Sequence, residues 1–119
     1  MKVRFLLDEH IDPDLRRGIL RSEPSIDPLR VGDPEAPPFG TLDPQLLRWL
    51  EVNQRLLITL NRRSMPGHLA VHHSAGGHTW GLAFVDATAR HGQIIESLLA
   101  LWVASEAEEW VDAIIEIPL

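Results

Sequence analysis

Short apolar segments alternate with longer amphipathic segments along the whole chain. The apolar segments have the length and composition of strands that are buried on both faces of a sheet. The predicted strands are Val3–Leu7, Leu29–Val31, Leu56–Leu60, Leu82–Val85 and Ala113–Ile117. Pro118 ends the last of these, because proline cannot donate to a strand ladder.

The amphipathic segments between these strands predict helices. Asp12-Pro13 and Asp43-Pro44 each combine an acid typical of an N-cap with a proline suited to the first helical position. Two further helices are predicted at Ser64–Ala75 and Gln93–Ala104, where apolar residues recur at helical spacing. Strands separated by helices favour an α/β fold: a three-layer sandwich with a mostly parallel sheet of four or five strands.

Length and composition place limits on the function. A chain of 119 residues is expected to form a single domain, residues 1–119. The net charge of −6 disfavours tight non-specific binding to nucleic acid, and the absence of cysteine excludes disulfides and thiolate metal sites. The longest apolar run, Leu98–Ala104, is too short to span a membrane. With no signal-peptide pattern near Met1, we expect a cytoplasmic protein without a membrane partner.

Polar clusters directly follow two of the predicted strands. Asp8 and Glu9 follow the first, and Asn61, Arg62 and Arg63 follow the strand in the middle of the chain. Ligands of open parallel sheets bind outside the carboxyl ends of the strands. A carboxylate that ends an apolar strand is costly unless it is paired or bound to a metal, so Asp8 favours a functional interpretation. These positions together predict a site for a metal ion and a phosphate.

Three segments, FLLDEHI, TLDPQLLRWLEVNQRLLITLNRRSMPGHL and GGHTWGLAFV, resemble the short bacterial PIN-like proteins of mostly unknown function. The resemblance extends over nearly the whole chain, from Lys2 to Ile117. PIN domains are a nuclease superfamily, and many are the ribonuclease toxins of toxin–antitoxin pairs. The resemblance implies a PIN-like fold and a Mg²⁺ or Mn²⁺ site built from three or four acids.

The resemblance also implies roles for individual residues. Asp8 matches the first acid of the family and Asp43 matches the acid that opens the next helix. Asn61 stands where family members commonly have an aspartate, which removes one anionic ligand. We therefore predict a Mg²⁺- or Mn²⁺-dependent ribonuclease in which Asp8, Asp43 and Glu9 hold metal. In this prediction Asn61 is a weaker ligand or anchors a water, and Arg62 or Arg63 contacts phosphate bidentately.

The same residues allow other interpretations. With Asn61 in place of an acid, the protein could be an inactive PIN-like binding module, with tryptophan-bearing helices forming an antitoxin or homodimer interface. Arg62 and Arg63 could be solvated, or they could pair with Asp8 and Glu9 and replace the metal by an ion-pair network. Asp43 could cap a helix, a role compatible with metal binding. His68 and His72, four residues apart on a predicted helix, could share a Zn²⁺.

Overall fold

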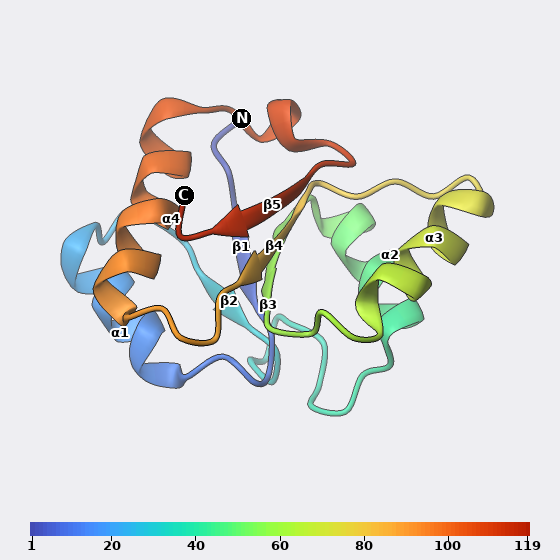
Figure 1. Ribbon diagram of the computed structural model, residues 1–119, viewed down its shortest axis with the longest axis horizontal. Helices are drawn as coiled ribbons and strands as arrows, with labels where there is room; N and C mark the ends of the chain where they lie inside the picture. Colours follow the sequence, from blue (N-terminus) through green and yellow to red (C-terminus); the bar gives the residue numbers. More distant parts are fainter.

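The computed structural model describes residues 1–119 and contains five strands, four α-helices and one 3₁₀-helix (Figure 1). In chain order these are β1 (Phe5–Leu7), α1 (Pro13–Ser22), β2 (Leu29–Arg30), α2 (Asp43–Asn53), β3 (Leu56–Thr59), α3 (Met65–Ser74), β4 (Leu82–Val85), α4 (His91–Ala104), η1 (Ala107–Trp110) and β5 (Ile114–Ile117). Every strand and helix predicted from the apolar pattern is present, with ends that differ by at most a few residues.

The five strands form one sheet, and every neighbouring pair in it is parallel. The order across the sheet is β2-β1-β3-β4-β5. The chain therefore leaves β1 to form β2 on one side and then returns to form β3 on the other side. This reversal places the carboxyl ends of β1 and β3 next to each other.

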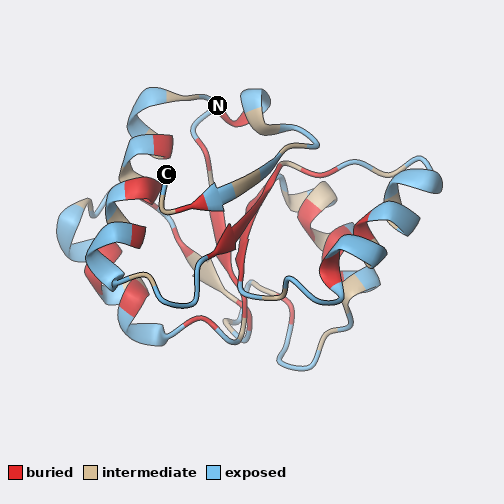
Figure 2. Cartoon of the chain, in the orientation of Figure 1, coloured by how far each residue is buried: buried red, intermediate tan, exposed pale blue.

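The helices cover both faces of the sheet, which makes the fold a three-layer α/β sandwich (Figure 1). α1 and α4 pack together on one face, and α2 and α3 pack together on the other. Successive strand residues point to opposite faces. In β3, for example, Ile58 joins the core beneath α1 and α4, whereas Leu57 joins the core beneath α2 and α3. Figure 2 shows the three central strands β1, β3 and β4 buried, whereas the edge strands β2 and β5 and the outer helix surfaces are more exposed.

The first helix follows the capping pattern of its sequence. Asp12 Oδ1 accepts a hydrogen bond from the Asp14 amide at 2.9 Å, and Pro13 occupies the first turn. Leu15 and Ile19 of α1 are buried, as their shared helix face predicts. No helix in the structure combines the length and the apolar content that crossing a membrane would require.

Candidate functional site

The carboxyl ends of β1 and β3 meet at the point where the chain reverses direction across the sheet. Leu7 at the end of β1 is in register with Ile58 of β3. Asp8 follows β1 immediately, and Asn61 lies two residues beyond the end of β3. Such a switch point is where ligands bind in open α/β sheets. The two polar clusters expected from the sequence therefore lie at one edge.

Asp8 is a buried carboxylate whose side-chain partners are neutral. It is 8% exposed. Its Oδ2 accepts a hydrogen bond from the Thr59 hydroxyl at 2.7 Å, and its Oδ1 accepts one from the Glu9 amide at 2.8 Å. Two hydrogen bonds reduce the cost of removing the carboxylate from water but supply no positive charge. A cation at this edge would stabilise Asp8 further.

Asp43 is the first residue of α2, and its carboxylate turns away from the helix backbone. The helix is capped one residue earlier, where the Leu42 carbonyl accepts the first helical bond from the Leu46 amide. The capping role expected for Asp43 is wrong, because no side-chain cap bond forms. Instead Asp43 Oδ2 accepts hydrogen bonds from Asn61 Nδ2 at 3.1 Å and from the Ser64 hydroxyl at 3.2 Å.

A chain of hydrogen bonds joins the two acids. The Thr59 hydroxyl donates to Asp8 and accepts a hydrogen bond from the backbone amide of Asn61 at 3.0 Å. The side-chain amide of Asn61 in turn donates to Asp43. Asn61 also exchanges bonds with Ser64, whose amide donates to Asn61 Oδ1 at 3.1 Å. Thr59 was not expected to take part. Its signal in the sequence is a single hydroxyl within an otherwise apolar strand.

Arg62 and Glu9 face away from this network. The Arg62 guanidinium pairs with the Glu116 carboxylate of β5, with Nη1 2.8 Å from Oε1, and lies over the Phe84 ring. This ion pair raises the pKa of Arg62 and lowers that of Glu116. Glu9 Oε1 accepts a hydrogen bond from the Gly40 amide at 3.2 Å. The expected ion pairs of Arg62 and Arg63 with Asp8 and Glu9 are not formed.

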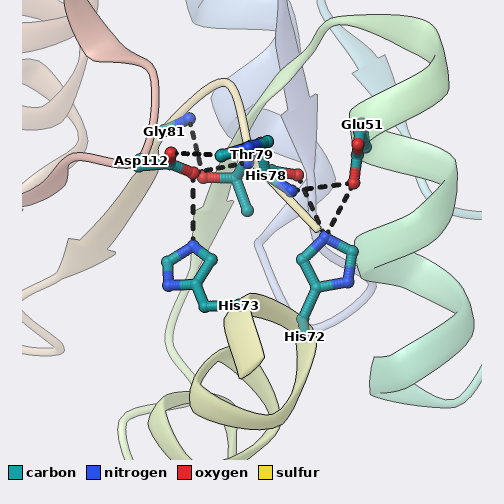
Figure 3. Close-up of polar contacts among 7 residues, drawn as sticks. All are labelled: Glu51, His72, His73, His78, Thr79, Gly81 and Asp112. Atoms are coloured by element: carbon teal, nitrogen blue, oxygen red, sulfur yellow. Dashed lines mark hydrogen bonds and ion pairs between the residues drawn. The ribbon is translucent and has the colours of Figure 1, made fainter. Parts of the chain in front are cut away.

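A second polar cluster lies at the opposite edge of the sheet, before β4 and β5 (Figure 3). His73 Nε2 and His78 Nδ1 contact the two oxygens of Asp112, at 3.2 and 2.7 Å. His72 Nε2 is 3.0 Å from Glu51 Oε1. No feature of the sequence links these histidines to Asp112 or Glu51, because these acids lie in other parts of the chain.

The histidine pair that suggested zinc does not converge. His68 Nε2 is 3.8 Å from Asp43, whereas His72 contacts Glu51. Nowhere do three or more histidine, aspartate or glutamate side chains form a group that could hold a metal ion. The carboxylates at the switch point are those of Asp8 and Asp43, and the part of the Asn61 side chain that faces Asp43 is its Nδ2 donor, not its oxygen. Mg²⁺ is commonly held by one or two carboxylates and keeps several waters, so Asp8 and Asp43 are the residues that could hold it.

Comparison with family models, with curated proteins and with solved structures found no match in any of the three. Membership of the PIN-like superfamily therefore stays a prediction from the sequence motifs. The structure itself shows the parallel α/β fold and the hydrogen bonds that connect Asp8 through Thr59 and Asn61 to Asp43.

Proposed function

We propose that the protein is a Mg²⁺- or Mn²⁺-dependent ribonuclease, acting as the toxin of a toxin–antitoxin pair. The observation that supports this proposal is the hydrogen-bonded link between Asp8 and Asp43 at the switch point. Neither acid has an arginine or lysine partner, and His68 approaches Asp43 only to 3.8 Å. Two acids without a strong counter-charge at a ligand-binding edge favour a divalent cation.

The residues have separate roles in this proposal. Asp8 and Asp43 hold the metal ion, which supplies an activated water and positive charge against the charge that develops on phosphate. Thr59 fixes the Asp8 carboxylate, and Asn61 fixes Asp43. Arg62 and Glu9 would have to leave Glu116 and Gly40 before they could contact phosphate or metal, so their predicted roles require rearrangement.

The test is cleavage of a fluorogenic single-stranded RNA in the presence of Mn²⁺. We expect the wild-type protein to cleave it, and Asp8→Asn and Asp43→Asn each to lower the rate by about 100-fold or more, as when one electrostatic stabiliser is removed. Glu96→Gln is the control, because it removes one exposed carboxylate from α4 and should cleave at the wild-type rate. Cleavage that survives Asp8→Asn would overturn the proposal.

The second candidate is a binding module that keeps the fold without catalysis. The observation that favours it is the Asn61 side chain, which donates to Asp43 and so partly satisfies that carboxylate without metal. Calorimetric titration with Mg²⁺ and Mn²⁺ separates the candidates. Saturable binding that is lost in Asp43→Ala supports the nuclease, and no binding at millimolar metal supports the module.

A further inference from the structure

A hollow of about 340 Å³ lies between α2 and α3 on the outer face of the sandwich. Pro44, Arg48 and Glu51 line it from α2, His68, Val71 and His72 line it from α3, and Ala75 lines it directly after α3. The turn after α3, Gly76-Gly77, lines it too. The α2 residues recur every three or four positions, so they form one stripe along that helix. The volume lies within the range of small-molecule sites in proteins.

One end of this α2–α3 groove is held in place by hydrogen bonds. His72, which also lines the groove, has its Nε2 3.0 Å from both Glu51 Oε1 and the His78 carbonyl (Figure 3). The backbone at Gly77 lies so close to this imidazole that a Cβ there would be 2.5 Å from His72 Nε2. Only glycine permits this approach. The wall is therefore preformed, which lowers the entropy cost of binding a ligand.

The charged side chains along the groove differ in whether they have partners within the chain. Glu51 accepts a hydrogen bond from the His78 amide and lies 3.0 Å from His72 Nε2, and Asp43, which lies beyond the groove in the neighbouring hollow, accepts hydrogen bonds from Asn61 and Ser64. Arg48 stands on the same α2 stripe between these two acids, and its guanidinium has no hydrogen-bond or ion-pair partner in the chain.

Between the bonded ends, the walls are largely apolar. Val71 is 69% exposed, and Pro44 and Ala75 also present apolar side chains. A ligand that places an anionic group on Arg48 and apolar surface against Val71 would satisfy the free cation and cover these walls.

We propose that the α2–α3 groove is a binding site for a small organic anion, a carboxylate, sulfonate or phosphate carried on an apolar body. Pro44 and Glu51 are seven residues apart on α2, so the groove is about 10 Å long at the helical rise of 1.5 Å per residue. This length and the single free cation fit one anionic group on a body of one or two rings.

This site is distinct from the switch-point site, and the proposal does not depend on nuclease activity. The two are neighbours, because Pro44 and His68 also line a second hollow that contains Asp43. Arg48 and Val71 line the groove but not the second hollow, so variants at these positions test the groove and leave the switch-point residues unchanged.

The test uses anilinonaphthalene sulfonate, an anion on an apolar ring system, and its neutral analogue N-phenylnaphthylamine. We expect the sulfonate to bind the folded protein saturably with one-to-one stoichiometry. Arg48→Gln should weaken this binding by about tenfold or more, as expected for losing a hydrogen bond to a charged group. Binding of the neutral analogue should change little, because it makes no use of the guanidinium.

A matched pair of charge insertions checks the location. Val71→Glu places a carboxylate in the groove and should abolish sulfonate binding. Val52→Glu adds the same charge at an 80% exposed position of α2 that does not line the groove, and it should bind like the wild type. Circular dichroism and melting temperature confirm that each variant is folded.

Backbone amide NMR gives an independent readout of the location. The sulfonate should shift the amide resonances of Gly76 and Gly77, which are easy to resolve because glycine amides have distinctive ¹⁵N chemical shifts. Unchanged binding in Arg48→Gln and Val71→Glu, the absence of saturable one-to-one binding, or shifts confined to residues outside the groove would each overturn the proposal.

Discussion

Acidic side chains gather at both edges of the sheet, and the two groups differ in how their charge is balanced. At the carboxyl edge, Asp8 and Asp43 are bonded mainly to hydroxyl and amide groups. At the amino edge, Glu51 contacts one imidazole and Asp112 contacts two. The first group has negative charge left for a ligand, whereas the second can neutralise its own charge when the histidines are protonated.

The carboxyl edge has the unbalanced charge of a ligand site, whereas the amino-edge contacts of Glu51 and Asp112 with His72, His73 and His78, here called the clamp, hold separate elements together. α3 connects the two edges: Ser64 before its first residue bonds to Asp43, and His72 and His73 in its last turn contact the amino-edge acids. The clamp at the amino edge holds the C-terminal end of α3. At the other end of α3, Ser64 lies beside the switch point and bonds to Asp43. Changes at the carboxyl edge should therefore alter ligand binding, and changes at the amino edge should alter stability with pH.

The largest expected effect is that of Thr59→Val, which keeps the shape of the side chain and removes its hydroxyl. Asp8 loses its side-chain donor and the Asn61 amide loses its acceptor, both at a fully buried position. We expect the free energy of unfolding at neutral pH to fall by about 1 to 3 kcal/mol, measured by urea denaturation. Thr59→Ser retains the hydroxyl and should lose less. Equal losses in the two variants would show that the hydroxyl does not support Asp8.

A smaller effect is expected for Asn61→Asp, which tests whether the negative charge at the carboxyl edge lacks a positive partner. Without metal, the substitution removes the Nδ2 donor to Asp43 and places a second carboxylate beside it. The free energy of unfolding should therefore fall by about 1 to 2 kcal/mol. With Mn²⁺, the melting temperature should rise more than that of the wild type, because added ligand charge tightens binding of hard cations. Gln54→Glu, the same chemical change at an exposed position, is the control. A metal-induced rise no larger than the wild type's would contradict the metal site.

The smallest effect is expected for Asp112→Asn, which tests the clamp. Asparagine tolerates the left-handed backbone of this residue (φ 60°) and keeps an oxygen for the Thr79 amide, but it removes the charge that faces His73 and His78. The variant should melt below the wild type at about pH 5 and close to it at about pH 9. Both melting temperatures come from scanning calorimetry.

The pH range follows from the shifted groups. Hydrogen bonding to Asp112 raises the pKa of His78 above its ordinary 6.5, so this stabilisation is complete below 6.5 and is lost as pH rises through the raised value. Partial burial alone would raise the pKa of Asp112, but the Thr79 amide and His78 lower it below 3.8, so its contribution disappears only in stronger acid. A variant-to-wild-type difference that grows with rising pH would contradict the clamp.

The sequence predicted local features more successfully than side-chain partners. The N-cap at Asp12 is present, because it depends on residues two positions apart. At Asp43 the same acid–proline signal was misleading, since Asn61 and Ser64 reach its carboxylate from another element. Arg62 was expected at phosphate or at Asp8, but Glu116 lies 54 positions along the chain and binds it instead.

The sequence by itself determined the succession of strands and helices and the presence of acids directly after the first strand. Both follow from apolar periodicity and turn chemistry over a few residues. Only the tertiary structure decided that β1 lies beside β3, that Thr59 and Asn61 link Asp8 to Asp43, and that Asp112 joins two histidines. These contacts depend on strand order and on how the helices pack on the sheet, which bring together side chains far apart along the chain.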